Sequence, residues 1–421
     1  MEIAYDGGNE MTWASSVSDD PELTEALSAA AVSIREGLRG RPPDLVIAFA
    51  SEHHRAGYTN VARLLAAEFP GTRIVGCSAG GVIGGGEEVE HRPGVSLTAA
   101  ALPGVSVDVI RIRNEELPGL DCSPREWRAL VKGEDESRFE GRSEREEADE
   151  GEEDVEHFIL FADPYSCDAE RLIQGLDYAF PSSIKIGGIA SGGQVTGYNV
   201  LFRDEEVFQE GAVLAVLKGK IECDAIVAQG CRPIGVPMTV TAGGNNVIRT
   251  LDGRPALLVL QEIFETLDPR DRELFRNSLF LGLLSRPYEE EYGPGDFLVR
   301  NLVGVDPSSG ALMIGAVVKV GQIVQFHLRD AETSAQDLEL LLDHYTTLPL
   351  SESVRGALLF SCLGRGMYLY GRPNHDTDLF REKLGNIPVG GFFANGEIGP
   401  IQGTTYIHGY TSAFGLFRPK G

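Results

Sequence analysis

The sequence lacks the signatures of several large protein classes. No run of 18 or more apolar residues occurs in its 421 residues, so no membrane-spanning helix is expected. The first residues, MEIAYDGGNEMTW, carry acidic side chains and no apolar segment, so no signal peptide is predicted. The six cysteines are widely spaced without a CxxC pair, which argues against a disulfide framework or a zinc site. We therefore expect reduced, mostly buried thiols and a cytoplasmic location.

Basic residues are also few, with 37 Lys and Arg against 63 Asp and Glu and a net charge of -26. This charge repels phosphate backbones and anionic membranes, so nucleic acid is not an expected partner. No HxH or HExxH motif is present, and the adjacent His53 and His54 indicate a loop, so no metal is predicted. No GxGxxG sequence opens a helix, so no nucleotide cofactor is predicted.

Glycine is abundant, with 51 residues, and it gathers in short runs after apolar segments. The chain is 42% hydrophobic, enough for sizeable cores, so these runs predict tight turns in a folded protein. Lys132–Glu156 differs, because it holds 13 acidic and four basic residues and almost no apolar ones. We expect a disordered surface loop there. Binding of a basic partner or of divalent ions is the alternative for this segment.

One order of elements recurs three times: strand, helix, strand, glycine turn, strand. An amphipathic helix at Pro21–Leu38 precedes the first set. The first strands end in Phe49-Ala50, Phe161-Ala162 and Phe360-Ser361, and a glycine pair or Gly-Cys pair follows about 30 residues later. Each set consists of a strand, a helix and two further strands, in that order. The predicted ranges are 44–50, 60–69, 73–77 and 95–102 for the first set; 157–162, 169–180, 184–189 and 212–217 for the second; and 357–362, 377–384, 387–393 and 411–417 for the third.

This recurrence predicts internal duplication of a β-α-β-β unit. A fourth, altered unit is expected from strands at 297–305, 312–318 and 323–328 and a helix at 335–345. The predicted fold class is α/β, with repeated β-α-β-β units forming two pseudo-related halves. We expect mixed sheets because the last two strands of each unit can form a hairpin. Two sheets packed in one body are the alternative to separate domains.

Several of these segments together resemble the FIST domains, named for F-box and intracellular signal-transduction proteins. Residues 74–80 (IVGCSAG) are similar to the N-terminal FIST motif, and 297–306 (FLVRNLVGVD) and 326–331 (FHLRDA) to the C-terminal one. The most specific segments are 360–366 (FSCLGRG), 390–400 (GGFFANGEIGP) and 408–411 (HGYT). The likeness covers about 43–416 and leaves out the acidic segment.

The resemblance implies a FIST N-like domain at 43–245 and a FIST C-like domain at 246–421, after a helical lead-in at 1–42. It also implies a small-molecule-binding sensory protein of intracellular signal transduction rather than an enzyme, with an amino acid among the possible ligands. No kinase, receiver or F-box segment is visible, so a separate signalling protein is the expected partner.

The glycine turns follow strand ends, where α/β folds usually bind ligands. Arg365 is a candidate for holding a ligand carboxylate and Glu397 for an amine, with a shared hollow between the bends. The alternatives are that the glycines only make tight bends, and that Arg365 and Glu397 form a structural ion pair. The candidate ligand-binding residues are Cys77, Ser78, Gly80, Ser191, Gly192, Ser361, Cys362, Gly364, Arg365, Gly366, Asn395, Glu397 and His408.

Two other function classes stay open. An enzyme would use Cys362 as nucleophile, His375 or His408 as base, and Glu397 or Asp376 to orient the base, as in a cysteine hydrolase or transferase. A protein-interaction scaffold would bind a protein partner without a small molecule.

Overall fold

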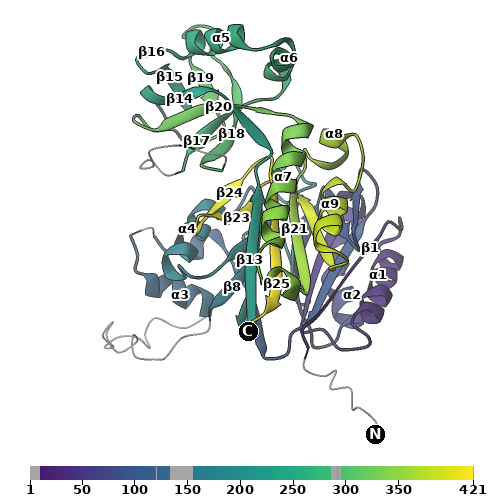
Figure 1. Ribbon diagram of the computed structural model, residues 1–421. Coiled ribbons are helices and arrows are strands. Elements are labelled where there is room, and N and C mark those ends of the chain that lie inside the picture. Colours follow the sequence, from purple (N-terminus) through teal and green to yellow (C-terminus); the bar gives the residue numbers. More distant parts are fainter. Residues whose placement is uncertain (1–9, 120, 133–154, 286–291, 293–294, 421) are drawn as a thin grey trace. The chain divides into compact units, whose positions relative to one another are not determined.

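The computed structural model describes residues 10–119, 121–132, 155–285, 292 and 295–420 (Figure 1). The acidic segment predicted to be a loop lies outside these residues except for its ends. The helix expected at 21–38 is confirmed as α1 (Leu23–Gly37), with Ala26, Leu27 and Ile34 buried along one face. The strands and helices predicted for the three recurring sets are confirmed as well, with ends that differ by a few residues.

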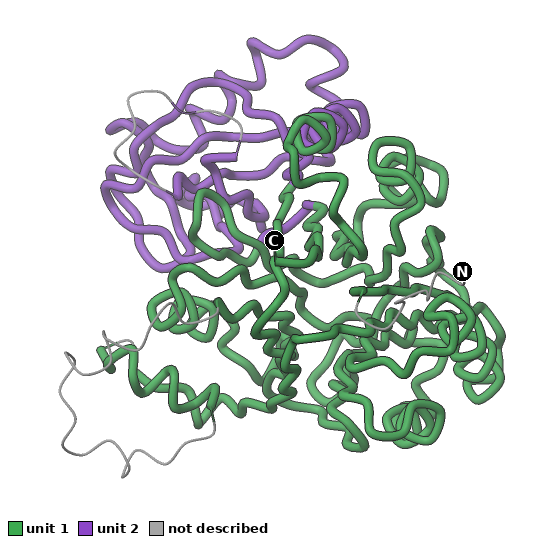
Figure 2. Tube along the Cα trace, turned by 60° about the horizontal axis from the view of Figure 1, so that its bottom comes forward, with its two compact units in different colours: residues 1–227, 342–407, 412–421 green, residues 228–341, 408–411 purple. Residues whose placement is uncertain are grey.

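The chain divides into two compact units (Figure 2). Unit 1 comprises residues 1–227, 342–407 and 412–421, and unit 2 comprises 228–341 and 408–411. The domain limits expected from the sequence stay predictions; α1 lies in unit 1, and residues 245 and 246 lie in a turn of unit 2.

Unit 1 contains three six-stranded sheets, with the orders β1-β6-β2-β3-β10-β11 (sheet 1), β24-β23-β9-β8-β12-β7 (sheet 2) and β13-β25-β21-β22-β4-β5 (sheet 3). The strands of sheet 1 are β1 (Thr12–Ser18), β2 (Leu45–Ser51), β3 (Arg73–Ala79), β6 (Val95–Ala101), β10 (Leu201–Arg203) and β11 (Glu206–Phe208). Those of sheet 2 are β7 (Val105–Ile112), β8 (Glu156–Ala162), β9 (Lys185–Ile189), β12 (Ala212–Gly219), β23 (Glu397–Ile401) and β24 (Thr404–His408). Those of sheet 3 are β4 (Gly81–Gly84), β5 (Glu87–Glu90), β13 (Ile221–Ala228), β21 (Gly356–Cys362), β22 (Val389–Ala394) and β25 (Ser412–Pro419).

Each sheet is built around the same two pairings. The first strand runs parallel to the second, as in β2 with β3, β8 with β9, and β21 with β22. On its other side the first strand pairs antiparallel with the last, namely β6, β12 or β25. The sheets are mixed, as expected, but the expected hairpin between the last two strands was wrong, because the last strand returns to the first. Internal duplication stays a prediction.

The short strand after each glycine bend joins a different sheet from the strand before it. β4 follows β3 of sheet 1 but pairs with β22 of sheet 3. β23 follows β22 but pairs with β9 of sheet 2, and β10 follows β9 but pairs with β3 of sheet 1. The exchange is cyclic, so each bend carries the chain from one sheet to the next and the three bends meet.

The inner faces of the three sheets share one apolar core. Phe49, Phe161 and Phe360 occupy equivalent positions on the first strands and are fully buried. The ring centroids of Phe49 and Phe161 lie 5.2 Å apart, and those of Phe161 and Phe360 5.9 Å apart. Burial of each ring contributes about 1.5–3 kcal/mol, so the residues that mark the recurring pattern also hold the sheets together.

Helices cover the outer faces of the sheets. The buried residues of α1 and α2 pack with sheet 1 and those of α3 and α4 with sheet 2. On sheet 3, the ring of Phe380 from α9 stacks on Phe414 of β25 at 5.3 Å. The helices that lie wholly or partly in unit 1 are α1, α2 (Tyr58–Glu68), α3 (Pro124–Lys132), α4 (Ala169–Ala179), α7 (Ala331–Thr346), α8 (Gly366–Tyr370), α9 (His375–Leu384) and the short η1 (Glu52–Gly57), η2 (Asn114–Glu116) and η4 (Ser351–Ser353).

Unit 2 is a single seven-stranded sheet that closes on itself, because β14 pairs with both β20 and β15. Its own core includes Val240, Leu281 and Phe326. The strands predicted at 297–305 and 323–328 and the helix at 335–345 are confirmed, and the strand at 312–318 is shorter than expected. The elements are β14 (Cys231–Gly244), β15 (Val247–Leu251), β16 (Arg254–Pro255), α5 (Ala256–Thr266), α6 (Pro269–Asn277), β17 (Leu279–Leu284), β18 (Phe297–Val305), β19 (Leu312–Ile314), β20 (Ile323–Arg329) and the first part of α7.

Candidate functional site

The bends after β3, β9 and β22 are hydrogen-bonded to one another through Ser191. Its Oγ accepts the Gly80 N–H at 2.9 Å and donates to the Phe393 carbonyl at 2.5 Å. Its own N–H donates to the Ser78 carbonyl at 3.2 Å, and Ser78 Oγ donates back to the Ser191 carbonyl at 3.2 Å. The structure therefore brings the predicted site residues Ser78, Gly80 and Ser191 together through direct hydrogen bonds.

The glycines of the first two bends allow this close approach. A Cβ at Gly192, whose φ is +88°, would lie 2.7 Å from the Ala79 carbonyl oxygen. A Cβ at Gly80 would lie 2.5 Å from Leu363 of the bend after β21. Cys77 is fully buried behind these bends, and burial raises the pKa of its thiol. These residues form the frame of the convergent bends.

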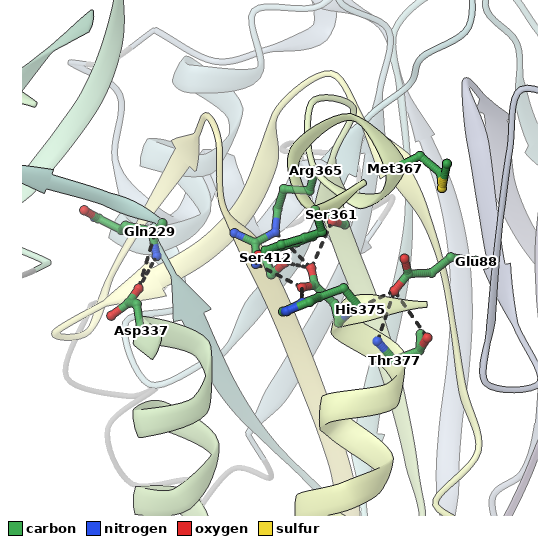
Figure 3. A network of polar contacts seen from close by, with 12 residues as sticks. Glu88, Gln229, Asp337, Ser361, Arg365, Met367, His375, Thr377 and Ser412 are labelled. Carbon is green, nitrogen blue, oxygen red and sulfur yellow. Dashed lines mark hydrogen bonds and ion pairs between the residues drawn. The ribbon is translucent and has the colours of Figure 1, made fainter. Parts of the chain in front are cut away.

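A buried ion pair stands at the end of β21. Arg365 is fully buried, and its Nε and Nη2 donate to Asp376 Oδ2 at 2.9 Å and Oδ1 at 3.0 Å (Figure 3). Such a forked pair is the strongest geometry for these two groups. Arg365 thus forms its ion pair with Asp376 from α9, a partner that the sequence interpretation had assigned to a different role.

Asp376 is the centre of a wider cluster. Its carboxylate also accepts hydrogen bonds from Ser361 Oγ at 3.3 Å and from Ser412 Oγ (Figure 3). Burial alone would raise the pKa of Asp376, but the Arg365 guanidinium and the hydrogen bonds with His375 and Ser412 hold that pKa well below its usual range. Asp376 is therefore ionised in the folded protein.

A second buried carboxylate, from Glu88 of β5, holds the first turn of α9. It accepts the N–H of Asp376 at 3.1 Å and of Thr377 at 3.0 Å, and the Thr377 hydroxyl at 3.2 Å. The Glu88 N–H in turn donates to Asn374 Oδ1 at 2.7 Å. Burial, with the Asp376 charge nearby, raises the pKa of Glu88 to about 8. The carboxyl groups of Asp376 and Glu88, which both lie at the start of α9, thus have pKa values shifted in opposite directions.

His375 is fixed beside the same carboxylate. Its Nδ1 lies 3.1 Å from Asp376 Oδ1, and its ring stacks on Tyr370 with centroids 3.5 Å apart. This is the orienting contact that the cysteine-enzyme hypothesis requires of a base. Cys362, the nucleophile of that hypothesis, is half-buried at the end of β21.

The remaining predicted residues lie at several places. Glu397 is fully buried at the start of β23, opposite Gly188 of β9. The Asn395 N–H donates to the Ile189 carbonyl at 3.0 Å. Gly366 is the first residue of α8 and has a φ of +54°, and a Cβ there would lie 2.2 Å from Glu90 Oε1. Gly364 is half-buried and lies directly before Arg365. His408 belongs to unit 2. The ligand-binding roles of these residues stay predictions.

Within the described part of the chain, no group of three or more His, Cys, Asp and Glu side chains is placed to hold a metal ion. No described helix has both the length and the apolar character needed to cross a membrane.

Comparison with known proteins settles the family. The FIST N domain model matches residues 44–254, and the FIST C domain model matches 256–400. The chain belongs to the FIST family. FIST domains are associated with signal transduction and are generally sensory rather than catalytic.

Similar FIST proteins occur in mycobacteria. The chain is 36% identical to the uncharacterized protein Rv0628c of Mycobacterium tuberculosis over 404 residues, which is 95% of this chain and 98% of that protein. It is 35% identical to the uncharacterized protein Mb0898c of Mycobacterium bovis, over 95% of this chain and 97% of the relative. A plant relative, an F-box/LRR-repeat protein of Arabidopsis thaliana, is 26% identical over 57% of this chain and 51% of its own length.

Sequence reasoning on this FIST protein missed the central place of Asp376 and the whole contribution of Glu88. Asp376 lies in the tripeptide Asn374-His375-Asp376, and the sequence predicts for it only the role of orienting a base. Glu88 lies 288 positions from the N–H that it accepts, in an acidic strand whose composition indicates a solvated surface. No local pattern in the sequence connects these two segments.

Proposed function

We propose that this FIST protein is a sensory protein of intracellular signal transduction that binds a small molecule at the convergent bends of unit 1. The proposed ligand is an amino acid or a small carboxylate. A separate signalling protein in the cytoplasm would detect the bound state.

The cyclic strand exchange is the observation that carries this proposal. Because each bend passes the chain between two sheets, a ligand that touches two bends would bias the relative positions of all three sheets. Differential affinity for two arrangements is all that a sensor requires, and no chemical step is needed.

The polar cluster around Asp376 adds support. Keeping a forked Arg–Asp pair fully buried is rarely the most stabilising choice, since well-packed apolar side chains often do as well or better. Buried ionised groups with displaced pKa values are more common at functional sites. Here they fix the bend that follows β21.

Direct ligand contacts would come from side chains beside the frame. The groups of Ser78, Ser191 and Arg365 described above are already engaged within the protein. Leu363, Met367 and Tyr368 belong to the bend after β21 and to α8, and they are 40%, 41% and 80% exposed. An apolar rim beside polar bends suits a small polar ligand with a short carbon chain.

A thermal-shift screen of amino acids and small carboxylates tests the proposal, followed by mass analysis of each active compound. We expect a saturable rise of the unfolding midpoint for one compound class and recovery of that compound unchanged. Tyr368→Ala should weaken binding about five- to tenfold, the size of one aromatic contact. Tyr178→Ala, which removes an exposed tyrosine from α4 in the same unit, is the matched control and should bind normally.

Two outcomes would reject the sensor. Turnover of the compound that stops in Cys362→Ala would favour the enzyme. A complete screen without any rise of the midpoint would favour a protein-interaction scaffold. The exposed Val195 and Tyr198 in the loop after β9 are the observation that supports this second candidate, because exposed apolar side chains near one another mark interaction surfaces.

A further inference from the structure

Unit 1 holds a cavity of about 570 Å³ that is lined by four basic side chains. Arg73 begins β3, Arg203 ends β10, Arg111 lies on β7, and Lys132 ends α3. Four basic side chains thus meet at one place in a chain with a net charge of -26. The acidic residues that line the same cavity are Asp108 and Glu156, and Glu156 has Lys218 within 3.5 Å.

The three arginines are held in place by their surroundings. Arg73 Nη1 lies 3.0 Å from Asp204 and Arg111 Nη2 lies 3.0 Å from Glu210, while Arg203 Nη2 pairs with Glu206. The guanidinium groups of Arg111 and Arg203 both lie over the ring of Phe208, at 4.1 Å and 5.5 Å from its centroid. Stacking of this kind orients a guanidinium without using its N–H groups.

Each of the three arginines nevertheless retains a polar group without a partner. The Nε atoms of Arg73, Arg111 and Arg203 are all buried and form no hydrogen bond. Buried N–H groups in proteins are nearly always satisfied, by protein, water or a bound ion. These three groups belong to arginines that line one cavity, where a bound acceptor would satisfy them.

The cavity also has an apolar wall, formed by Val109, Leu130 and Val216 among others. A free inorganic ion would leave this wall unused. A molecule with an oxyanion at one end and a carbon skeleton at the other would use both parts. Arginine forks match the geometry of phosphate oxygens, to which they can donate two hydrogen bonds each.

We propose that this cavity is a binding site for a small phosphorylated molecule, with Arg73, Arg111 and Arg203 around the phosphate. The site is formed by residues other than those of the Asp376 cluster, so it stands or falls independently of the sensory proposal.

Calorimetric titration of the full-length protein tests this site, with inorganic phosphate, pyrophosphate and ribose 5-phosphate as probes and citrate as a carboxylate comparison. We expect ribose 5-phosphate to bind more tightly than inorganic phosphate, because its carbon skeleton also reaches the apolar wall. Arginine forks pair with carboxylates too, but citrate has no uncharged end to face that wall, so it should bind more weakly than ribose 5-phosphate. Affinity should decrease as salt concentration rises.

Three variants and a control separate this site from general attraction of anions. Arg111→Gln and Arg203→Gln should each weaken ribose 5-phosphate binding at least tenfold, and Arg111→Lys should restore only part of it, since lysine keeps the charge but not the fork. Arg92→Gln is the matched control, because Arg92 is an exposed arginine of the same unit that pairs with Asp19 at 2.6 Å. It should bind as the unmodified protein does.

Circular dichroism establishes that each variant is folded before it is titrated, and Arg203→Lys replaces Arg203→Gln if the latter unfolds. The proposal is overturned if none of the phosphate probes binds at physiological salt. It is equally overturned if Arg92→Gln and Arg111→Gln weaken binding to the same extent, or if citrate binds as tightly as ribose 5-phosphate.

Discussion

Replacing Gly76 by alanine tests the close approach of β2 and β3, on which the convergence of the bends depends. Gly76 faces Ala48 in the parallel register of these strands. A Cβ at Gly76 would lie 1.8 Å from the Ala48 carbonyl oxygen, whereas real Cβ contacts are not shorter than 3.0 Å. The strands would therefore have to separate by at least about 1.2 Å, the difference between these two distances.

A separation of this size breaks hydrogen bonds, because an N–H···O bond of about 2.9 Å would be stretched well past the useful range. Two or three ladder bonds at about 1 kcal/mol each, with about 1–3 kcal/mol of overpacking, are opposed by about 0.4–1 kcal/mol from a less flexible unfolded chain. We expect Gly76→Ala to lower the free energy of unfolding by about 3–5 kcal/mol.

Gly71→Ala is the control in the same unit. Gly71 has a φ of +78° but nothing within 4 Å of its Cβ position, so alanine there meets backbone strain without a clash. Its expected cost is about 1–2 kcal/mol.

Tryptophan fluorescence during urea unfolding measures both variants. The two tryptophans of the chain, Trp13 and Trp127, are buried in unit 1, so the signal reports on that unit. If Gly76→Ala unfolds at the same urea concentration as the unmodified protein, or costs less than Gly71→Ala, the close approach and the argument built on it are refuted.

Three further outcomes are expected. Gly187→Ala and Gly391→Ala should each cost at least as much as Gly76→Ala, because their Cβ atoms would also lie 1.8 Å from a carbonyl oxygen of the parallel neighbour, and urea unfolding measures this. Between about pH 4.5 and 8, Glu88 in the folded protein keeps a proton that the unfolded chain has released, so the stability should fall as the pH rises through this window. In Glu88→Gln, the urea concentration at the unfolding midpoint should depend less on pH in the same window. Arg365→Met leaves the Asp376 charge buried without its main partner and should lower the free energy of unfolding by about 3–5 kcal/mol. The double variant Arg365→Met/Asp376→Leu should recover most of this loss. The control Arg381→Met, which breaks an exposed ion pair, should cost less than about 1 kcal/mol, and urea unfolding measures all three.

Much of the local structure followed from the sequence. Residues 45–50 are apolar at every position and buried at every position, which is the pattern of a strand covered on both faces. The amphipathic spacing in α1 and the glycine bends after the strands were equally visible. Local propensity and periodicity depend on neighbouring residues, so one sequence suffices to read them.

The pairing of strands was harder to predict from the sequence. The expectation of a hairpin between the last two strands failed because an antiparallel partner is chosen by packing over long separations, and the sequence pattern is compatible with either neighbour. The strand exchange at the bends, for example β4 with β22, joins segments about 300 residues apart and left no local signal.

The sequence by itself determined the elements, the glycine bends, the acidic character and membership of the FIST family. Only the tertiary structure decided that Arg365 pairs with Asp376, that Glu88 caps the same helix, and that three arginines gather at one cavity. Ion pairs and hydrogen bonds form between groups that the fold brings within about 3 Å, and that proximity depends on how all three sheets pack together.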